Sequence, residues 1–209
     1  MSLKATRTTR AGLDRASIVD AAATLADADA EGLEELTLAA LAARLGVRTP
    51  SLYNHIAGLP GLRRELALEG TRELGRRIGR AAIGKASDEA IAAMAEAYRA
   101  FVRERPGLYA ASVRAPDPAD ADLQAAAREV VDVILTVLAP YGVRDDEALH
   151  AVRGLRALAH GFATLEAAGG FGLPLDRDES FRRLVAAFVE GLRRHNDRDG
   201  ARLSETIAG

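Results

Sequence analysis

The stretch LTLAALAARLGVRTPSLYNHI, residues 36–56, begins with a regular apolar pattern and ends in a group of polar and aromatic side chains. Its apolar residues at helical spacing are Leu38, Leu41, Ala42 and Leu45. Thr37 is a suitable N-cap for this helix, and Gly46 is expected to end it. Thr49 and Pro50 follow closely and are typical of an N-cap and the first position of another helix. Two helices joined by a tight glycine turn predict a helix-turn-helix.

The second of these helices carries the polar group. Leu52 and Ile56 lie four residues apart and are expected to pack inward, which leaves the polar side chains facing outward. A reader of the DNA major groove needs short donors and acceptors near a helix N-terminus. Asn54 suits an adenine edge, whereas Tyr53 and His55 suit phosphates. The residues that we predict to contact DNA in this stretch are Thr37, Arg48, Thr49, Pro50, Ser51, Tyr53, Asn54 and His55.

Charge is distributed unevenly along the chain, although the net charge is only -2. Residues 58–85 contain seven basic and three acidic side chains, and the first fifteen residues contain four basic and one acidic. This excess predicts that the front half meets an anion, with Arg63 and Arg64 as further sources of charge. The basic residues expected to contact DNA from an arm over residues 1–12 are Lys4, Arg7 and Arg10. The alternative is that these charges form ordinary solvated helix faces.

Composition narrows the class of protein. The chain has 209 residues, of which 48% are apolar and only 4% aromatic, so Ala and Leu dominate and an all-α fold is expected. The absence of Cys excludes disulfides and thiolate chemistry. We find neither a secretory leader nor a run of ~20 apolar residues that would span a bilayer. We therefore expect a cytoplasmic protein with no membrane contact, no metal and no cofactor.

The remaining pattern predicts the domain organisation. A first helix should begin after Asp14 and end at Gly32. A linker helix should follow from about 60 to 82, with an inner face formed by Leu62, Leu66, Leu74 and Ile78. Longer amphipathic helices come after it, with breaks near Pro106 and Pro140. The predicted divisions are a basic arm over 1–12, a helix-turn-helix domain over 13–57, a helical ligand-binding and dimerisation domain over 58–195, and a polar, disordered tail over 196–209.

The last two predicted helices carry more apolar surface than one neighbouring helix needs. Such a surplus predicts a symmetric four-helix contact between two chains, and a palindromic DNA site also requires a dimer. The residues that we assign to this dimer interface are Val152, Leu155, Phe181, Val185, Phe188 and Leu192. The alternative is that these residues form ordinary core.

The front of the sequence resembles the tetracycline-repressor (TetR) family of bacterial regulators. Residues 13–62 carry the resemblance in IVDAA, GLEELT, LAARLGV and PSLYNHI, in this order, followed by Leu62. The sequence differs from the family pattern at Arg48, at Ile56 and at Leu59, where a phosphate-contacting Lys is common. The resemblance implies a homodimeric regulator, a repressor that binds a palindromic double-stranded operator and is released by a small hydrophobic or amphipathic effector.

Residues 155–185 resemble a C-terminal type within the same family, which is marked by a His-Gly pair and an aromatic-Gly loop. A Trp often precedes that pair, and this chain has no Trp. We expect the effector pocket to be largely apolar, and its candidate residues, chosen from their positions, are Phe101, Tyr109, Leu158, His160, Phe162 and Leu165. His160 could face this pocket or the dimer contact. His160 has an alternative role as a structural residue in the core.

Two other classes of protein were considered. An enzyme is disfavoured because the sequence contains no HExxH, no GxSxG and no P-loop, and its four His residues lack metal-ligand spacing. A helical protein-interaction or architectural module would account for the apolar helices. It would not account for the polar face behind a basic arm.

Overall fold

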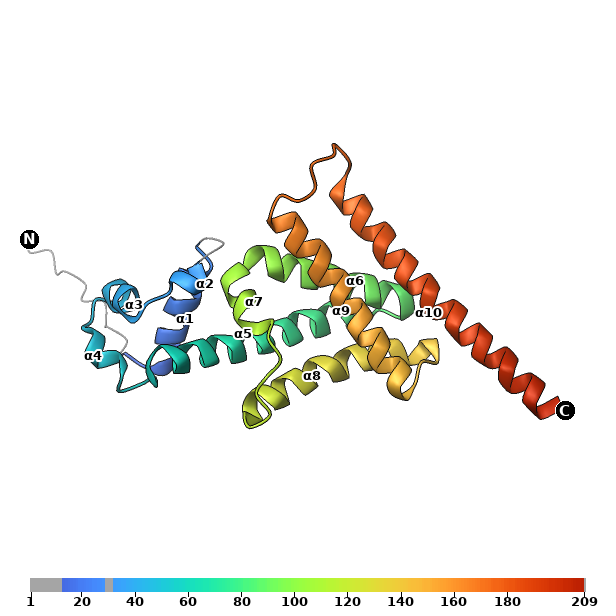
Figure 1. Cartoon of the computed structure of the whole chain (residues 1–209), viewed down its shortest axis with the longest axis horizontal. Helices are drawn as coiled ribbons and strands as arrows, with labels where there is room; N and C mark the ends of the chain where they lie inside the picture. The colour runs from blue at the N-terminus through green and yellow to red at the C-terminus, as the bar shows by residue number, and fades with distance from the viewer. Residues whose placement is uncertain (1–12, 29–31, 209) are drawn as a thin grey trace, which may run out of the picture.

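A computed structural model describes residues 13–28 and 32–208, with side chains described up to Arg194. These residues form helices joined by turns, and they contain no strand. Figure 1 shows a small N-terminal head joined by one long helix to a larger helical body. The structure therefore confirms the all-α prediction.

The head contains four short helices, and its first helix starts where the sequence predicted. Helix α1 spans Arg15–Ala26, and Asp14 and Ser17 form a reciprocal cap at its start. The Asp14 carboxylate accepts a hydrogen bond from the Ser17 N–H at 2.7 Å, and the Ser17 hydroxyl accepts one from the Asp14 N–H at 3.1 Å. This capping box fixes the entry to α1.

The role predicted for Gly32 was wrong. Helix α1 already ends at Ala26, and Gly32 begins a separate short helix, α2, at Gly32–Glu35. Gly32 is required there by close packing, because an added Cβ would lie 2.6 Å from the Ala26 carbonyl oxygen.

Helices α3 and α4 complete the head. Helix α3 spans Leu38–Leu45 and α4 spans Thr49–Leu52. Thr37 caps α3 by accepting a hydrogen bond from the Ala40 N–H at 3.1 Å, and Gly46 ends it in a left-handed conformation with φ 67°. The residues that close the small core of the head include Ile18, Ala22, Leu36, Leu41, Leu52 and Ile56.

Helix α5 spans Gly58–Ala82 and runs from the head into the body. Its buried residues include the four that the sequence predicted for its inner face, Leu62, Leu66, Leu74 and Ile78. The body packs around it through α6 (Ser87–Glu104), α7 (Pro106–Ser112), α8 (Ala121–Leu138), the 3₁₀ turn η1 (Ala139–Tyr141), α9 (Asp145–Ala167) and α10 (Arg177–Ala208).

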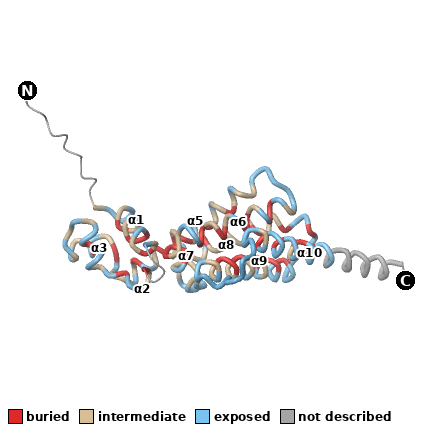
Figure 2. The backbone as a smooth tube through the Cα atoms, turned by 90° about the horizontal axis from the view of Figure 1, so that it is seen from above, coloured by how far each residue is buried: buried red, intermediate tan, exposed pale blue. Residues whose placement is uncertain are grey.

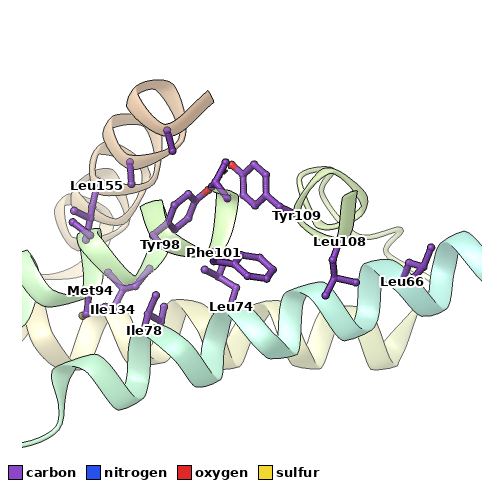
Figure 3. Packing of buried hydrophobic residues seen from close by; sticks show 14 of the residues in the cluster. Leu66, Leu74, Ile78, Met94, Tyr98, Phe101, Leu108, Tyr109, Ile134 and Leu155 are labelled. Carbon is purple, nitrogen blue, oxygen red and sulfur yellow. Dashed lines mark hydrogen bonds between the residues drawn. The ribbon is translucent and has the colours of Figure 1, made fainter. Parts of the chain in front are cut away.

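The core lies along the inside of both parts (Figure 2). Helices α6, α7 and α8 each pack on α5, and α9 packs on α6 on the outer side. Figure 3 shows this packing from close by, with Leu74 and Ile78 of α5 under Phe101 and Met94 of α6. Because α5 is shared by head and body, the same helix supports both.

The backbone near the C-terminus differs from the predicted disordered tail. Helix α10 continues without a break at residue 196 and ends at Ala208. Residues 196–208 contain no proline, so nothing in them forces the helix to stop. None of the helices in the described part of the chain is both long and apolar enough to cross a bilayer.

Candidate nucleic-acid interface and effector site

The predicted reading element is present, but its helix begins one residue earlier than expected. Arg48 is the N-cap, with φ -86° and ψ 143°, and Thr49 is the first helical residue. The Ser51 N–H donates to the Arg48 carbonyl oxygen at 2.9 Å. Pro50 is tolerated because the first turn of a helix has no internal acceptor for its missing N–H.

Helix α4 ends at Leu52, so Tyr53, Asn54 and His55 lie in the turn that follows it and not within the helix. The N–H groups of His55 and Ile56 both donate to the Leu52 carbonyl oxygen, at 2.9 and 3.0 Å. Leu52 and Ile56 are buried, as predicted, and they anchor this turn. The Tyr53 side chain is 59% exposed and Asn54 is also exposed, whereas His55 is half-buried.

The segment that carries this turn has no acidic residue of its own, and Asp14 of the α1 cap contributes a negative charge near His55. No Asp or Glu occurs between Thr37 and Leu62. Arg44 and Arg48 are exposed and make no hydrogen bond or ion pair with the described residues. A basic surface with unoccupied donors is what a phosphate backbone requires.

Other predicted DNA contacts fall into three groups. Thr49 and Ser51 are half-buried and Pro50 is exposed on the same turn. The Thr37 hydroxyl is already engaged as the cap of α3. The arm residues Lys4, Arg7 and Arg10 lie outside the described residues.

The expectation that Arg63 and Arg64 supply charge for DNA needs correction. Arg63 lies within 3.5 Å of the Leu33 carbonyl oxygen and 3.4 Å of that of Glu34, so it covers the end of α2. Arg64 binds the Asp120 carboxylate with Nε at 2.5 Å and Nη2 at 2.6 Å. Both guanidinium groups form hydrogen bonds within the chain. Their acceptors are distant in sequence but lie close to them in the folded structure.

Arg64 belongs to a row of ion pairs that joins the head to α8. Arg15 of α1 pairs with Glu65, which also accepts from Arg64 at 3.0 Å. Arg64 also pairs with Asp122 at 2.9 Å and with Asp120, the N-cap of α8. The Arg64 hydrogen bonds lower the pKa of the Asp120 carboxyl below its usual value.

A second junction lies at the other end of α1. Asp27 accepts hydrogen bonds from Nε of Arg105 at 2.6 Å and from the Leu108 N–H at 3.0 Å. Arg105 also donates to Glu73 of α5 at 3.1 Å. At Gly107, an added Cβ would lie 2.1 Å from the Ala26 carbonyl oxygen, so the start of α7 rests directly on the end of α1. Helix α1 is therefore attached to the body at both ends.

The centre of the body contains a short polar chain in an aromatic setting. The Tyr98 and Tyr109 hydroxyls are 2.8 Å apart, and the Tyr109 hydroxyl is hydrogen-bonded to Nδ1 of His160. Figure 3 shows the two tyrosines turned toward each other above Phe101. Burial, with the neighbouring Tyr98, raises the pKa of Tyr109 well above its usual value, so this phenol stays protonated. These hydrogen bonds between side chains link α6, α7 and α9.

The six predicted effector residues do not form one pocket. Phe101 and Tyr109 are buried and His160 is half-buried around the polar chain. Phe162 lies elsewhere, between Phe171 and Phe181 with ring centroids 4.7 and 4.9 Å away. The two leucines face outward to different degrees, Leu158 being half-buried and Leu165 53% exposed.

Arg99 is a structural residue that the sequence prediction missed. It is only 2% exposed and binds Glu166 through two hydrogen bonds of 2.7 and 2.6 Å. It also donates to Asp178 at 2.8 Å, and its guanidinium lies 5.3 Å from the Phe162 ring centroid. The available signal was its position among the apolar residues of α6, because a charge on that face must find partners.

The predicted dimer residues also need correction. Within the single chain the structure already buries Val152, Leu155, Phe181, Val185 and Leu192, each at most 7% exposed. They pack in the core of the body, so they have little surface left for a partner. Phe188 differs because it is half-buried and lies across Gly154 of α9.

Comparison with known proteins supports the same architecture. Residues 91–188 match the family model described as "Tetracyclin repressor-like, C-terminal domain". The uncharacterized HTH-type transcriptional regulator Rv0681 of Mycobacterium tuberculosis is 35% identical over 191 residues, which cover 91% of this chain and 86% of that protein. The uncharacterized HTH-type transcriptional regulator YobS of Bacillus subtilis is 38% identical over 184 residues, covering 88% and 94%.

Among solved structures, a substituted TetR protein of Acinetobacter baumannii AYE in complex with minocycline superposes with a TM-score of 0.67. The match covers 88% of this chain and 99% of that chain at 20% identity. At this identity it shows a shared fold and no more. No comparison tests the resemblance of residues 155–185 to the His-Gly type, which stays a prediction.

Proposed function

The chain belongs to the TetR family of helix-turn-helix transcriptional regulators, and from this premise we propose that it is a repressor that binds a palindromic operator as a homodimer and is released by a small effector. Members of this family are DNA-binding regulators and not enzymes. The observation that carries the proposal is the exposed polar turn at Tyr53 and Asn54, in a segment from Thr37 to Leu62 that contains no carboxylate.

The reading surface combines two kinds of contact. Asn54 is exposed in the turn after α4 and suits the edge of an adenine, while Tyr53 and Arg48 suit phosphates. The buried Leu52 and Ile56 hold the turn to the head, so its side chains are positioned before DNA arrives. Pre-positioned side chains lose less conformational entropy on binding, which favours affinity.

The proposed dimer contact uses the face of α9 and α10 that the single chain leaves uncovered. Its members are small or apolar and recur at helical spacing: Gly154, Leu158, Gly161 and Leu165 on α9, with Leu184, Phe188 and Gly191 on α10. Leu165 is 53% and Leu184 40% exposed, and the glycines permit close approach of helices. Such a dimer places two reading turns on one face of the duplex, about 34–36 Å apart along successive major grooves.

The proposed effector binds in the body, and the effect of its binding reaches the head through α1. The Tyr98–Tyr109–His160 chain offers hydrogen-bonding groups in an apolar core, which suits an amphipathic effector. Tyr109 lies on α7, whose first turn contacts Asp27 at the end of α1. A shift of α7 would therefore tilt the head, and linkage requires that the effector and the operator weaken each other's binding equally.

The experiment that tests the proposal is selection of bound sequences from a random duplex library by the purified protein, run beside Tyr53→Ala. We expect an inverted repeat that the variant fails to enrich. Ile83→Ala is the matched control, because Ile83 is 75% exposed at the far end of α5 and should leave the selection unchanged. Equal enrichment by wild type and Tyr53→Ala would contradict the reading surface, and a single half-site would contradict the dimer.

A further inference from the structure

The turn between α9 and α10, residues 168–176, encloses a small cavity of about 210 Å³. Phe162, Phe171, Leu173 and Leu175 form its apolar walls. An apolar protein cavity of roughly 150 Å³ is enough to hold one benzene molecule. The cavity therefore has room for one aromatic ring with a small substituent.

The walls of this cavity include a glycine-rich turn with exposed apolar side chains. Phe171 lies between glycines in the sequence GGFG, and Gly169 adopts φ 69°. The side chain of Phe171 is 36% exposed and its ring contacts Phe162, whereas Leu173 and Leu175 are 75% and 70% exposed. So much apolar surface in a glycine-rich turn is unusual unless something covers it, and a bound ring would let all three side chains bury more area.

One wall of the cavity is cationic. Arg177 lines it, and the nearest carboxylate oxygen to its Nε is that of Glu166 at 3.9 Å, beyond hydrogen-bonding distance. Glu166 receives two hydrogen bonds from Arg99 at 2.7 and 2.6 Å, whereas its ion pair with Arg177 is long and contains no hydrogen bond. The Arg177 guanidinium is 56% exposed and remains available to another carboxylate.

We propose that this cavity binds a monocyclic aromatic acid, with the ring packed against the Phe162–Phe171 pair and the carboxylate on Arg177. Ring stacking and a charge-assisted hydrogen bond are the two interactions that such a molecule offers, and the cavity supplies a partner for each. The site is separate from the Tyr98–Tyr109–His160 chain. Its role as an effector site rests on the regulatory function proposed above, but binding itself does not.

A bound acid would act on the attachment of the last helix. Arg99 joins α6 to Glu166 near the end of α9 and to Asp178 near the start of α10, and it stacks on Phe162 and Phe181. A ring packed on Phe162 lies next to this arrangement. Occupancy should therefore hold the α9–α10 turn in one position relative to α6.

The test is calorimetric titration of the full chain with benzoate and with benzyl alcohol, its neutral counterpart of similar size. We expect saturable binding of benzoate and weaker binding of benzyl alcohol. Arg177→Gln should weaken benzoate binding about ten-fold, because it removes one charge-assisted hydrogen bond. Phe171→Ala should weaken both ligands, and Arg194→Gln, an exposed arginine further along α10, is the matched control that should change neither.

Three results would overturn the proposal. These are absence of saturable benzoate binding, equal affinity for the acid and the alcohol, and unchanged benzoate affinity in Arg177→Gln. A fourth result comes from analytical sedimentation of a Leu173→Ser, Leu175→Ser double variant. If the wild type were a dimer and this variant a monomer, the exposed turn would be a contact with a second copy of the chain and not a ligand site. The DNA selection is independent of these measurements, so the cavity and the regulatory function can fail separately.

Discussion

The reading surface of the head and the junctions between helices of the body use charged side chains in opposite ways. At these junctions charged groups meet each other: Arg99 holds Glu166 and Asp178, and Arg77 holds Glu73 and Glu104. On the reading surface of the head, Arg44 and Arg48 have no partner among the described residues. A paired charge supports the fold, whereas an unpaired charge remains available to a molecule outside it.

The largest expected effect comes from the most buried charge. Arg99→Met should lower the free energy of unfolding by about 3 kcal/mol, because Glu166 loses two hydrogen bonds while it stays mostly buried. Urea unfolding followed by circular dichroism measures the change. Arg194→Met is the control, since its pair with Glu190 is exposed and should contribute at most ~0.5 kcal/mol. Similar losses in the two variants would remove the distinction between buried and exposed pairs.

The junction between the two regions should give the next largest effect. Gly107→Ala places a methyl group 2.1 Å from the Ala26 carbonyl oxygen, so α7 must move away from α1. We expect a loss of about 2 kcal/mol in unfolding free energy, which is typical of overpacking. Gly172→Ala is the control, because an added Cβ there meets no atom within 4 Å. A neutral Gly107→Ala would mean that the head is not held tightly by α7.

The same contrast between local and distant interactions explains which features could be predicted from the sequence. Helix caps and apolar spacing are local, so Thr37, Gly46, the capped start at Asp14 and the inner face of α5 were predicted correctly. Pairings between distant segments are not local. Arg64 and Asp120 lie 56 residues apart in sequence, and nothing in either neighbourhood marks them as partners.

Effector and dimer residues are harder to predict from sequence for a related reason. Helical spacing shows that Val152 and Phe181 are apolar and on one face, but it does not show whether that face meets the same chain or another. The structure buries both in the body. It leaves a neighbouring face only partly covered, with small residues such as the half-buried Gly161, which a pattern based on large apolar side chains passes over.

An unpaired charge on the head should matter for DNA and not for stability. Arg48→Ala should weaken operator binding about ten-fold, or ~1.4 kcal/mol, and reduce its salt dependence by about one released counterion. Unfolding free energy should stay within ~0.5 kcal/mol, because Arg48 is exposed and unpaired in the described structure. Titrations of the selected operator at several salt concentrations give both quantities.

Arg64→Ala provides the opposite case. Its partners Asp120 and Asp122 belong to the body, so this variant should lose stability and keep its salt dependence. If Arg64→Ala and Arg48→Ala affected DNA binding equally, charge pairing would not separate the two regions.

The smallest expected effect is a dependence of stability on pH that belongs to the body. Hydrogen bonds from Arg99 lower the pKa of Glu166, so its contribution is fully present above the unfolded pKa of about 4.5 and is lost as pH falls through the lower, folded value. Glu166→Gln should therefore be less stable than wild type at pH 7, and the difference should shrink below about pH 4.5. It should be smaller than the Arg99→Met effect because Asp178 still binds Arg99. Unfolding series at pH 7, 5 and 3.5, with the exposed Glu190→Gln as control, measure it. A difference that stayed constant with pH would show that Glu166 acts through packing and not through its charge.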